Sequence, residues 1–373
     1  MGSDVLPLSG VRVIAIEQAV AAPFATSRLA DAGAEVIKIE RPEGDFARGY
    51  DDVAAGQSSY FVWLNRGKTS LVLDLASPEG KARLADLLSD ADVLVQNLKN
   101  GALDRLGFPV ERLERDYPRL ISCAITGYGS DGPMAERKAY DLLIQAESGL
   151  CSITGGPDEP ARVGISIVDI ATGATAHAAI LEALLRRGVT GRGAAIAVSM
   201  FDVMADWLTV PLLNHEGGKS PRRVGMAHPS IAPYGVFEAS DGALVLISVQ
   251  SDREWRNLCD TFLGKRDLGT DPRFATNVAR VANRAATDAA VAEGFARRTG
   301  EEAIAALLRA DVALAAVNDM AGLAGHPHLR RIQVGTPNGP VSYPAPGARW
   351  KGESRAYGPV PALGNANRGG GDD

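Results

Sequence analysis

The sequence predicts an α/β protein with a large Rossmann-like domain, built on a mostly parallel sheet, and a smaller α+β domain. Short apolar runs recur through the first half of the chain, and stretches with helical spacing separate them; these runs lie at 11–16, 35–40, 70–75, 92–95 and 120–126. Strands that alternate with helices form parallel sheets covered on both faces. The length of 373 residues exceeds one ordinary core and fits two domains.

The first half supplies the elements of the sheet in order. A strand at 11–16 (VRVIAI) precedes a helix at 21–32, and the strand EVIKIE follows at 35–40. After the strand at 70–75, Ser77, Pro78 and Glu79 begin a helix with a capping hydroxyl, a proline at the first helical position and an acid in the first turn. The first strand is not followed by GxGxxG, so the usual dinucleotide fingerprint is missing.

The second half begins with a long helix predicted over 173–187 and a strand over 194–200. The stretch 213–233 is rich in glycine and proline and is predicted to connect the domains. The elements expected after it are a hairpin at 234–249 that turns at Ser240-Asp241-Gly242, helices at 252–263 and 280–298, and a helix that begins at the capping box of Thr299 and Glu302.

Charge and cysteine content exclude several classes of protein. The net charge is −6, whereas a protein of nucleic acids or anionic membranes would carry a basic excess. No segment approaches the ~18 apolar residues of a membrane span, and no signal peptide is recognised at the start. The three cysteines are widely spaced and form no CxxC pair, which favours a reducing cytoplasm over a disulfide framework. We therefore expect neither nucleic acid nor a membrane among the partners.

The run from Leu8 to Pro42 (LSGVRVIAIEQAVAAPFATSRLADAGAEVIKIERP) closely resembles the opening of the class III CoA-transferases, the formyl-CoA transferase/carnitine CoA-transferase family. Similar stretches follow in the expected order at 65–68, 92–107, 127–133, 138–149, 168–169, 190–193 and 228–234. The resemblance covers nearly the whole chain. Within the family, the stretches around Trp207 to Tyr234 and at Arg253 look most like the mesaconyl-CoA and succinyl-CoA dicarboxylate transferases.

The resemblance implies an interlocked homodimer whose large domain is completed by the returning C-terminus of the chain. The predicted domains are the first part of the large CoA-binding domain at 1–212, a linker at 213–233, the small domain at 234–325, and a return to the large domain at 326–373 with a disordered tail. The family needs no resident cofactor or metal, and a coenzyme A ester is its substrate. The pair His326 and His328 lacks a carboxylate at ligand spacing, so we expect no metal site there.

Asp169 matches the nucleophilic aspartate of the family. A carboxylate can attack an acyl-CoA thioester to form a mixed anhydride and then itself become a CoA thioester, which a serine or cysteine cannot do. Asp169 is expected to follow a short apolar run at 165–168 and to precede a helix, whose N-terminus would favour its ionised form. An aspartate before a helix is also a common N-cap, but the surrounding matches favour catalysis.

Tyr140 and Asp141 match positions beside this nucleophile. The hydroxyl of Tyr140 can donate to a developing oxyanion, whereas Asp141 is either part of the active site or the cap of a helix. The resemblance also implies a set of CoA contacts, in which Arg and Lys suit the phosphates; this set comprises Val20, Ala21, Arg41, Leu73, Asn97, Leu98, Arg105 and Lys138. Val20 stands where formyl-CoA transferase has a glutamine.

The substrate class is narrowed by two departures from other members of the fold. An acyl-CoA racemase needs a histidine at the position of Tyr140, and a tyrosine with a pKa of about 10 is a poor base. The glycine-rich loop of formyl-CoA transferase is absent at 248–253, which disfavours formate and oxalate. We expect a short dicarboxylate such as succinate or mesaconate, with His228 and Arg253 near the acyl or acceptor group; Arg222 and Arg223 are further candidates. A racemase and a non-catalytic CoA-ester binding protein stay open as alternatives.

Overall fold

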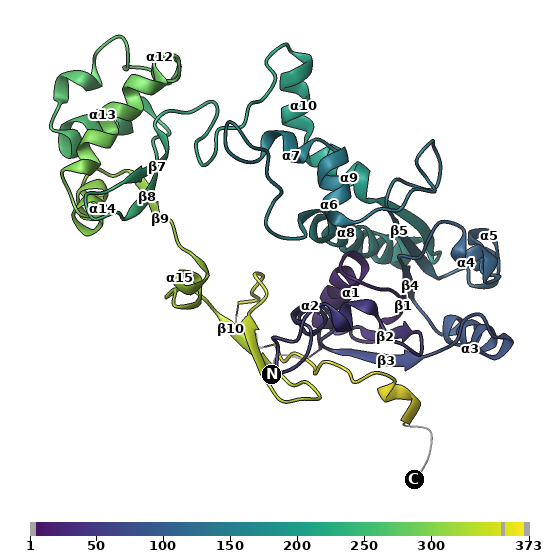
Figure 1. Cartoon of the computed structure of the whole chain (residues 1–373). Helices are drawn as coiled ribbons and strands as arrows, with labels where there is room; N and C mark the ends of the chain where they lie inside the picture. Colours follow the sequence, from purple (N-terminus) through teal and green to yellow (C-terminus); the bar gives the residue numbers. More distant parts are fainter. Residues whose placement is uncertain (1–4, 352–354, 369–373) are drawn as a thin grey trace. The chain divides into compact units, whose positions relative to one another are not determined.

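The computed structural model describes residues 5–351 and 355–368, which divide into two compact units (Figure 1). The first unit comprises the residues up to 150, residues 162–213 and the chain from 330 onward. The second comprises residues 151–161 and 214–329. The glycine-rich tail at 369–373, predicted to be disordered, lies outside the described residues. The assignment of the units to a CoA-binding domain and a smaller domain stays a prediction.

The first unit is built on a six-stranded sheet in which all strands are parallel, as the sequence predicts. The strands are β1 (Arg12–Ile16), β2 (Glu35–Glu40), β3 (Lys68–Val72), β4 (Val93–Gln96), β5 (Ile121–Thr126) and β6 (Ala194–Ser199). Their order is β3-β2-β1-β4-β5-β6, so the direction of winding reverses between β1 and β4. Ligands of such sheets bind beyond the carboxyl ends of the strands at this reversal. The loops after Ile16 and Gln96 are therefore the expected walls of a site.

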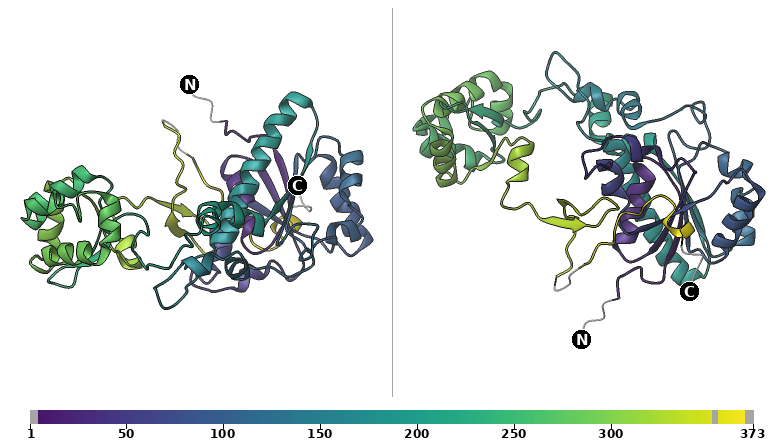
Figure 2. Two further views of the ribbon diagram at one scale, coloured as in Figure 1. Left: turned by 90° about the horizontal axis from the view of Figure 1, so that it is seen from above. Right: turned by 60° about the horizontal axis from the view of Figure 1, so that its bottom comes forward.

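Helices cover both faces of this sheet (Figures 1 and 2), and apolar side chains on both faces of its strands are buried against them. On one face, α1 (Ala21–Asp31) and α8 (Ile167–Thr190) pack with Val13 and Ala15 of β1. On the other, Ile14 and Ile16 pack with α3 (Pro78–Ser89), α4 (Ala102–Arg105) and α5 (Val110–Asp116). Among the described helices, α8 alone has the length and composition of a membrane span, but its inner face is buried in this core.

Two helices begin at the capping residues expected from the sequence, and a third helix begins earlier than expected. Ser77 Oγ accepts from the Gly80 amide at 3.0 Å and caps α3, and Thr299 and Glu302 form the capping box of α14 (Gly300–Arg309). The helix predicted over 173–187 begins earlier, at Ile167. The end of the apolar run before Asp169 therefore belongs to the first turn of α8, because burial of Val168 in the core overrides its preference for a strand.

The remaining elements of the first unit lie between and after the strands. They are η1 (Phe46–Gly49), α2 (Ser59–Leu64), α6 (Asp141–Glu147), α7 (Leu150–Ile153), α9 (Met200–Trp207), α10 (Thr209–Glu216), β10 (Arg331–Val334), β11 (Val341–Pro344) and η4 (Asn365–Arg368), with α7 and α10 reaching into the second unit. The end of the chain runs along the edge strand β3, where Asn365 Oδ1 accepts from the Ser70 amide at 2.7 Å and Asn367 Oδ1 from the Val72 amide at 2.8 Å. These side chains pair groups that an exposed sheet edge would leave open.

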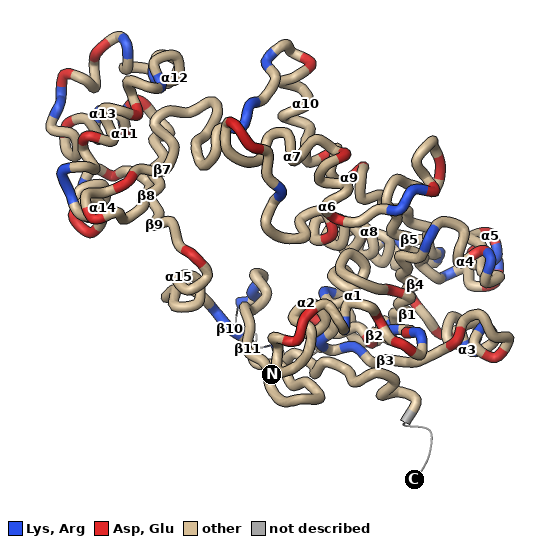
Figure 3. Tube along the Cα trace, viewed as in Figure 1, with Lys and Arg blue, Asp and Glu red and all other residues tan. Residues whose placement is uncertain are grey.

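The second unit has a three-stranded antiparallel sheet covered by helices. The predicted hairpin is confirmed as β7 (Tyr234–Glu238) and β8 (Leu244–Ser248), and β9 (Ala313–Ala316) pairs with β8. The predicted helices at 252–263 and 280–298 are each divided. The helical segments are α11 (Asp252–Asn257), the π-helical η2 (Leu258–Leu263), η3 (Arg266–Gly269), α12 (Asn277–Ala282), α13 (Arg284–Ala296), α14 and α15 (Met320–Ala324). Basic and acidic residues are interspersed along the described parts of both units (Figure 3).

Gly173 allows α8 to approach α1 closely, which generates a stability prediction. A Cβ at Gly173 would lie 2.5 Å from the Ala21 carbonyl oxygen, whereas a Cβ at Gly188 of the same helix meets no atom within 4 Å. We expect Gly173→Ala to lower the free energy of unfolding by about 1–3 kcal/mol, measured by urea denaturation. Gly188→Ala is the matched control and should raise it by about 0.5–1 kcal/mol. A stable Gly173→Ala protein would contradict the close packing of α1 and α8.

Candidate active site

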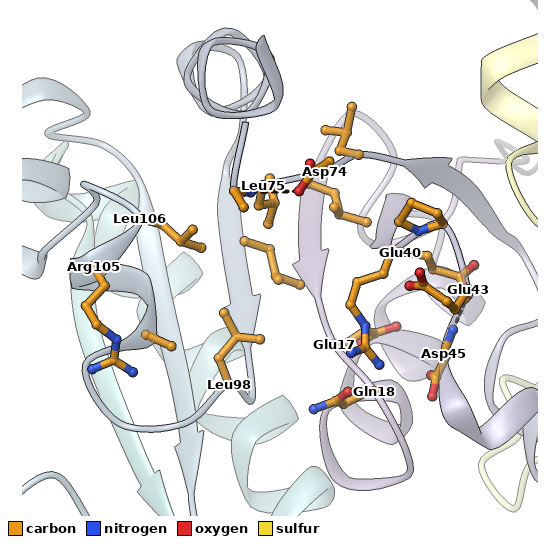
Figure 4. A pocket seen from close by; sticks show the side chains of 18 residues that line it. Glu17, Gln18, Glu40, Glu43, Asp45, Asp74, Leu75, Leu98, Arg105 and Leu106 are labelled. Atoms are coloured by element: carbon orange, nitrogen blue, oxygen red, sulfur yellow. Dashed lines mark hydrogen bonds between the residues drawn. The ribbon is translucent and has the colours of Figure 1, made fainter. Parts of the chain in front are cut away.

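Two neighbouring cavities lie at the reversal of strand order, both within the first unit. The first, called here the Arg41–Arg105 cavity, has a volume of about 610 Å³ and is lined by loops after β1, β2 and β3 and by α4. Figure 4 shows Leu98 and Arg105 on one side of it and Glu40 and Asp45 on the other. The second, the Asp169 cavity, has a volume of about 360 Å³. Gln18 and Leu98 line both cavities, so the two share a wall.

Asp169 is partly buried in the first turn of α8 and lines the Asp169 cavity. None of the described residues donates a hydrogen bond to its carboxylate. Burial, and then the nearby Asp141 carboxylate, raise the pKa of Asp169 to about 7. A partly buried carboxylate with a raised pKa and no hydrogen-bond partner, facing a cavity, is typical of a functional group.

The Asp141 carboxylate binds the free amides at the N-terminus of α8, which were expected to stabilise the ionised form of Asp169. Its Oδ1 accepts from the amides of Val168 at 2.7 Å and Asp169 at 3.2 Å, and its Oδ2 accepts from Gln145 Nε2 at 2.7 Å. Asp141 therefore caps a helix, as one of the two interpretations held, but α8 instead of its own α6. Although a helix N-terminus was expected to favour the ionised form of Asp169, burial and the Asp141 carboxylate raise its pKa to about 7. The N-cap interpretation of Asp169 is also wrong, because the N-cap position of α8 is Ser166.

Aromatic side chains border the same carboxylate. Tyr140 lines the Asp169 cavity with 60% of its surface exposed. Burial raises the pKa of Tyr50 to about 12, with further contributions from Asp45, Asp169 and Tyr140, so its hydroxyl remains a hydrogen-bond donor at neutral pH. Its ring packs edge-on against Tyr60 at 5.6 Å. The sequence analysis missed Tyr50 and Tyr60; the aromatic residues that cluster after the strand at 35–40 were the available signal.

Most residues expected to contact CoA line one of the two cavities. Arg41, Leu73 and Arg105 line the Arg41–Arg105 cavity; Ala21, Asn97 and Lys138 line the Asp169 cavity; and Leu98 lines both. Val20 does not line either cavity, because its side chain packs in a small apolar cluster with Phe24 and Leu64. The structure thus brings seven of the eight residues together around a common wall. Their roles in CoA binding stay predictions.

The residues expected at the acyl group lie in the second unit. The ring of His228 stacks on Tyr234 at a centroid distance of 5.2 Å, and its Nδ1 accepts from the Ser230 amide. Arg253 is mostly exposed, and its guanidinium lies 3.9 Å from Asp311. Within residues 5–351 and 355–368, no group of three or more His, Cys, Asp or Glu side chains is arranged to hold a metal ion.

A cluster of buried charges lies directly behind the shared wall of the cavities. The side chains of Glu17, Lys38 and Lys68 are fully buried. Glu17 Oε1 accepts from Lys68 Nζ at 2.6 Å and lies 3.4 Å from Lys38 Nζ, while Lys38 Nζ also donates to Asp45 at 2.8 Å. Burial, opposed in part by Glu17, lowers the pKa of Lys68 to about 8. The sequence analysis missed this cluster, although a lysine inside the buried strand EVIKIE signalled it.

Comparisons with known proteins point to one family. The chain matches the family described as CoA-transferase family III over residues 8–367. Acetyl-CoA:oxalate CoA-transferase of Acetobacter aceti is 38% identical over 91% of this chain and 87% of that protein. Succinate–glutarate CoA-transferase of Agrobacterium fabrum is 41% identical over 74% of this chain and 72% of that protein. The crystal structure of a CAIB/BAIF family protein from Brucella suis is 37% identical, covers 98% of this chain and 99% of its own, and has a TM-score of 0.84.

The raised pKa of Asp169 predicts a pH-dependent gain of stability in Asp169→Asn. Asp169 ionises near pH 4 in the unfolded chain and near pH 7 in the folded protein, so the wild type loses stability between these values and keeps the loss above them. Asparagine does not titrate. We expect the variant to match the wild type near pH 4 and to exceed it by about 2–4 kcal/mol at pH 8. Urea denaturation across this range tests it, with the exposed Asp131→Asn as a control that shows no such trend.

Proposed function

The chain belongs to CoA-transferase family III, and we propose that it moves CoA from an acyl-CoA donor to a short dicarboxylic acid through covalent intermediates on Asp169. The observation that carries the proposal is the Asp169 carboxylate, which has no hydrogen-bond partner among the described residues and faces a cavity beside the larger Arg41–Arg105 cavity. The chain is a class III CoA-transferase, and the resemblance found in the sequence is confirmed over nearly its whole length.

In the proposed reaction, each intermediate keeps an activated acyl bond, a thioester or an anhydride, and no step is a hydrolysis. The Asp169 carboxylate attacks the donor thioester carbonyl, the carbon–sulfur bond breaks, and a mixed anhydride and CoA thiolate form. The thiolate attacks the Asp169 carbonyl, releases the donor acid and leaves an aspartyl-CoA thioester. The acceptor carboxylate then attacks this thioester to give a second anhydride. The thiolate finally attacks the acceptor carbonyl, which yields the new CoA ester and regenerates Asp169.

The surroundings of Asp169 fit these steps. The raised pKa leaves a substantial ionised fraction at neutral pH, and a carboxylate with no donors to satisfy is a stronger nucleophile than a hydrogen-bonded one. Each attack places negative charge on a carbonyl oxygen. The hydroxyls of Tyr50 and Tyr140 are the proposed donors to these oxyanions, since Tyr50 stays protonated at neutral pH.

We propose that the CoA moiety occupies the Arg41–Arg105 cavity and directs its pantetheine arm past Gln18 toward Asp169. The guanidinium groups of Arg41 and Arg105 suit phosphate oxygens, and the side chains of Leu73 and Leu98 suit the adenine. Gln18 borders both cavities and marks the passage between them.

The relatives' names support a dicarboxylate as the acceptor. They specify oxalate in one case and succinate with glutarate in the other. Oxalate, disfavoured from the missing glycine-rich loop, therefore belongs in the test panel. The second carboxylate requires a cation. Arg222 and Arg253 stay the candidates for it, whereas the guanidinium of Arg223 already donates to the carbonyls of Ser152, Gly156 and Pro157.

An interlocked homodimer in the cytoplasm is the proposed setting. Large apolar side chains are exposed on α9 and α10, namely Trp207, Val210 and Leu213, and a second copy of the chain would cover them. Cys123, Cys151 and Cys259 are all free thiols, as a reducing compartment requires.

The covalent mechanism is tested by trapping the intermediate. We expect succinyl-CoA without an acceptor to convert Asp169 to a thioester or anhydride, which hydroxylamine or borohydride traps and peptide mass spectrometry maps. Asp169→Ala should give no adduct. If neither succinyl-CoA nor a panel of other acyl-CoA esters gave an adduct on the wild type, the mechanism would be contradicted. Measurable α-proton exchange would then favour a racemase.

The pH dependence of this acylation reports the pKa of Asp169. Only the carboxylate attacks, so kcat/KM should rise about tenfold per pH unit below pH 7 and level off above it. Asp141→Asn keeps an oxygen for the α8 amides but removes the neighbouring charge, so its inflection should fall to lower pH. Stopped-flow acylation measures both profiles, with Asp131→Asn as control. An unchanged or higher inflection in Asp141→Asn would show that Asp141 does not raise the pKa.

A further inference from the structure

The loop between β1 and α1 forms the shared wall of the two cavities and has an unusual conformation. Gln18 lines both cavities, and Ala19 and Ala21 line the Asp169 cavity. Ala19 has φ of 63°, in the left-handed region that residues with a Cβ rarely adopt. Such a conformation persists only where the surrounding structure enforces it, and it occurs often at functional sites.

The buried carboxylate of Asp45 enforces it. Its Oδ1 accepts from the amides of Ala19 at 3.1 Å and Ala47 at 2.9 Å, and its Oδ2 accepts from Lys38 Nζ at 2.8 Å. The Asp45 amide in turn donates to Glu40 Oε2 at 2.8 Å. Both oxygens and the backbone of Asp45 are therefore fixed, and a rigid acceptor is presented to Ala19.

The same loop is held from its other side. Gln18 donates its amide to Asn97 Oδ1 at 3.0 Å and accepts from Asn97 Nδ2 at 2.8 Å. Asp45, which follows β2, and Asn97, which follows β4, thus both bind the backbone of this loop at Gln18 and Ala19. The charge behind Asp45 is balanced, since Lys38 also faces Glu17 and Glu17 faces Lys68. The wall between the cavities is therefore tied to the sheet at two points.

We propose that Asp45 is a positioning residue for CoA transfer. By holding Ala19 in the left-handed conformation, it keeps the Arg41–Arg105 cavity aligned with the Asp169 carboxylate. A CoA ester bound through its phosphates in the Arg41–Arg105 cavity then presents its thioester to Asp169. The inference rests on the proposed function, because it requires the CoA moiety and the reacting carbonyl to occupy the two cavities at once. The remote part of the substrate then contributes its binding energy to the reaction.

A comparison of full and truncated donors tests this role. Succinyl-pantetheine reaches Asp169 but lacks the adenosine and its phosphates, so its reaction does not depend on register between the cavities. We expect the ratio of kcat/KM for succinyl-CoA to kcat/KM for succinyl-pantetheine to fall by about tenfold or more in Asp45→Ala, mainly through kcat. Asp31→Asn is the matched control, because it disrupts the buried Asp31–Arg66 pair of the same unit without touching the loop. It should lower thermal stability and leave the ratio unchanged.

A glycine at position 19 supplies the second test. Glycine adopts positive φ without restraint, so Asp45→Ala should reduce the ratio less in an Ala19→Gly background than in the wild type. If Asp45→Ala does not fold, Asp45→Leu replaces it, since leucine has a similar shape but offers the Ala19 amide no acceptor. An unchanged ratio in the Asp45 variant, or equal effects in both backgrounds, would overturn the inference. Failure of the wild type to form an Asp169 adduct would instead overturn the proposed function.

Discussion

The proposed mechanism depends on one constraint: the Asp169 carboxylate must accept no hydrogen bond from another residue of the protein. The fold meets this constraint by giving the free amides at the start of α8 to Asp141. Burial raises the pKa of Asp169, and the Asp141 carboxylate adds electrostatic repulsion to this effect. The carboxylate proposed as the nucleophile therefore has unused lone pairs and a pKa of about 7.

The position of this group follows from the topology of the sheet. The reversal of strand order between β1 and β4 leaves their following loops side by side, and Asn97 bonds to Gln18 across that boundary. One loop therefore borders both cavities, which is where the proposed mechanism brings CoA and the reacting acid together. The buried charges at Glu17, Lys38, Asp45 and Lys68 are costly to desolvate, and their value lies in fixing the backbone of that loop.

The sequence predicted the sheet well because its signals are local. Apolar runs marked the strands, and Ser77 and Thr299 marked two helix starts. It misplaced the start of α8, since tertiary burial of Val168 decides that boundary. It also could not indicate the environment of Asp169, because Asp141 lies 28 residues away in sequence and only folding brings it to the helix amides. Seven of the residues expected to contact CoA line the cavities, whereas the side chain of Val20 packs against Phe24 and Leu64. Which of the eight residues contact CoA stays a prediction.

The path of oxygen atoms through one turnover distinguishes an aspartyl intermediate from direct transfer. An acceptor labelled with oxygen-18 in its carboxylate leaves one labelled oxygen on the proposed nucleophile when CoA thiolate attacks the acceptor carbonyl of the second anhydride. After turnover, we expect oxygen-18 in the carboxyl group of Asp169, located by peptide mass spectrometry, and later in the donor acid released in further cycles. Turnover that leaves Asp169 unlabelled would contradict the aspartyl intermediate.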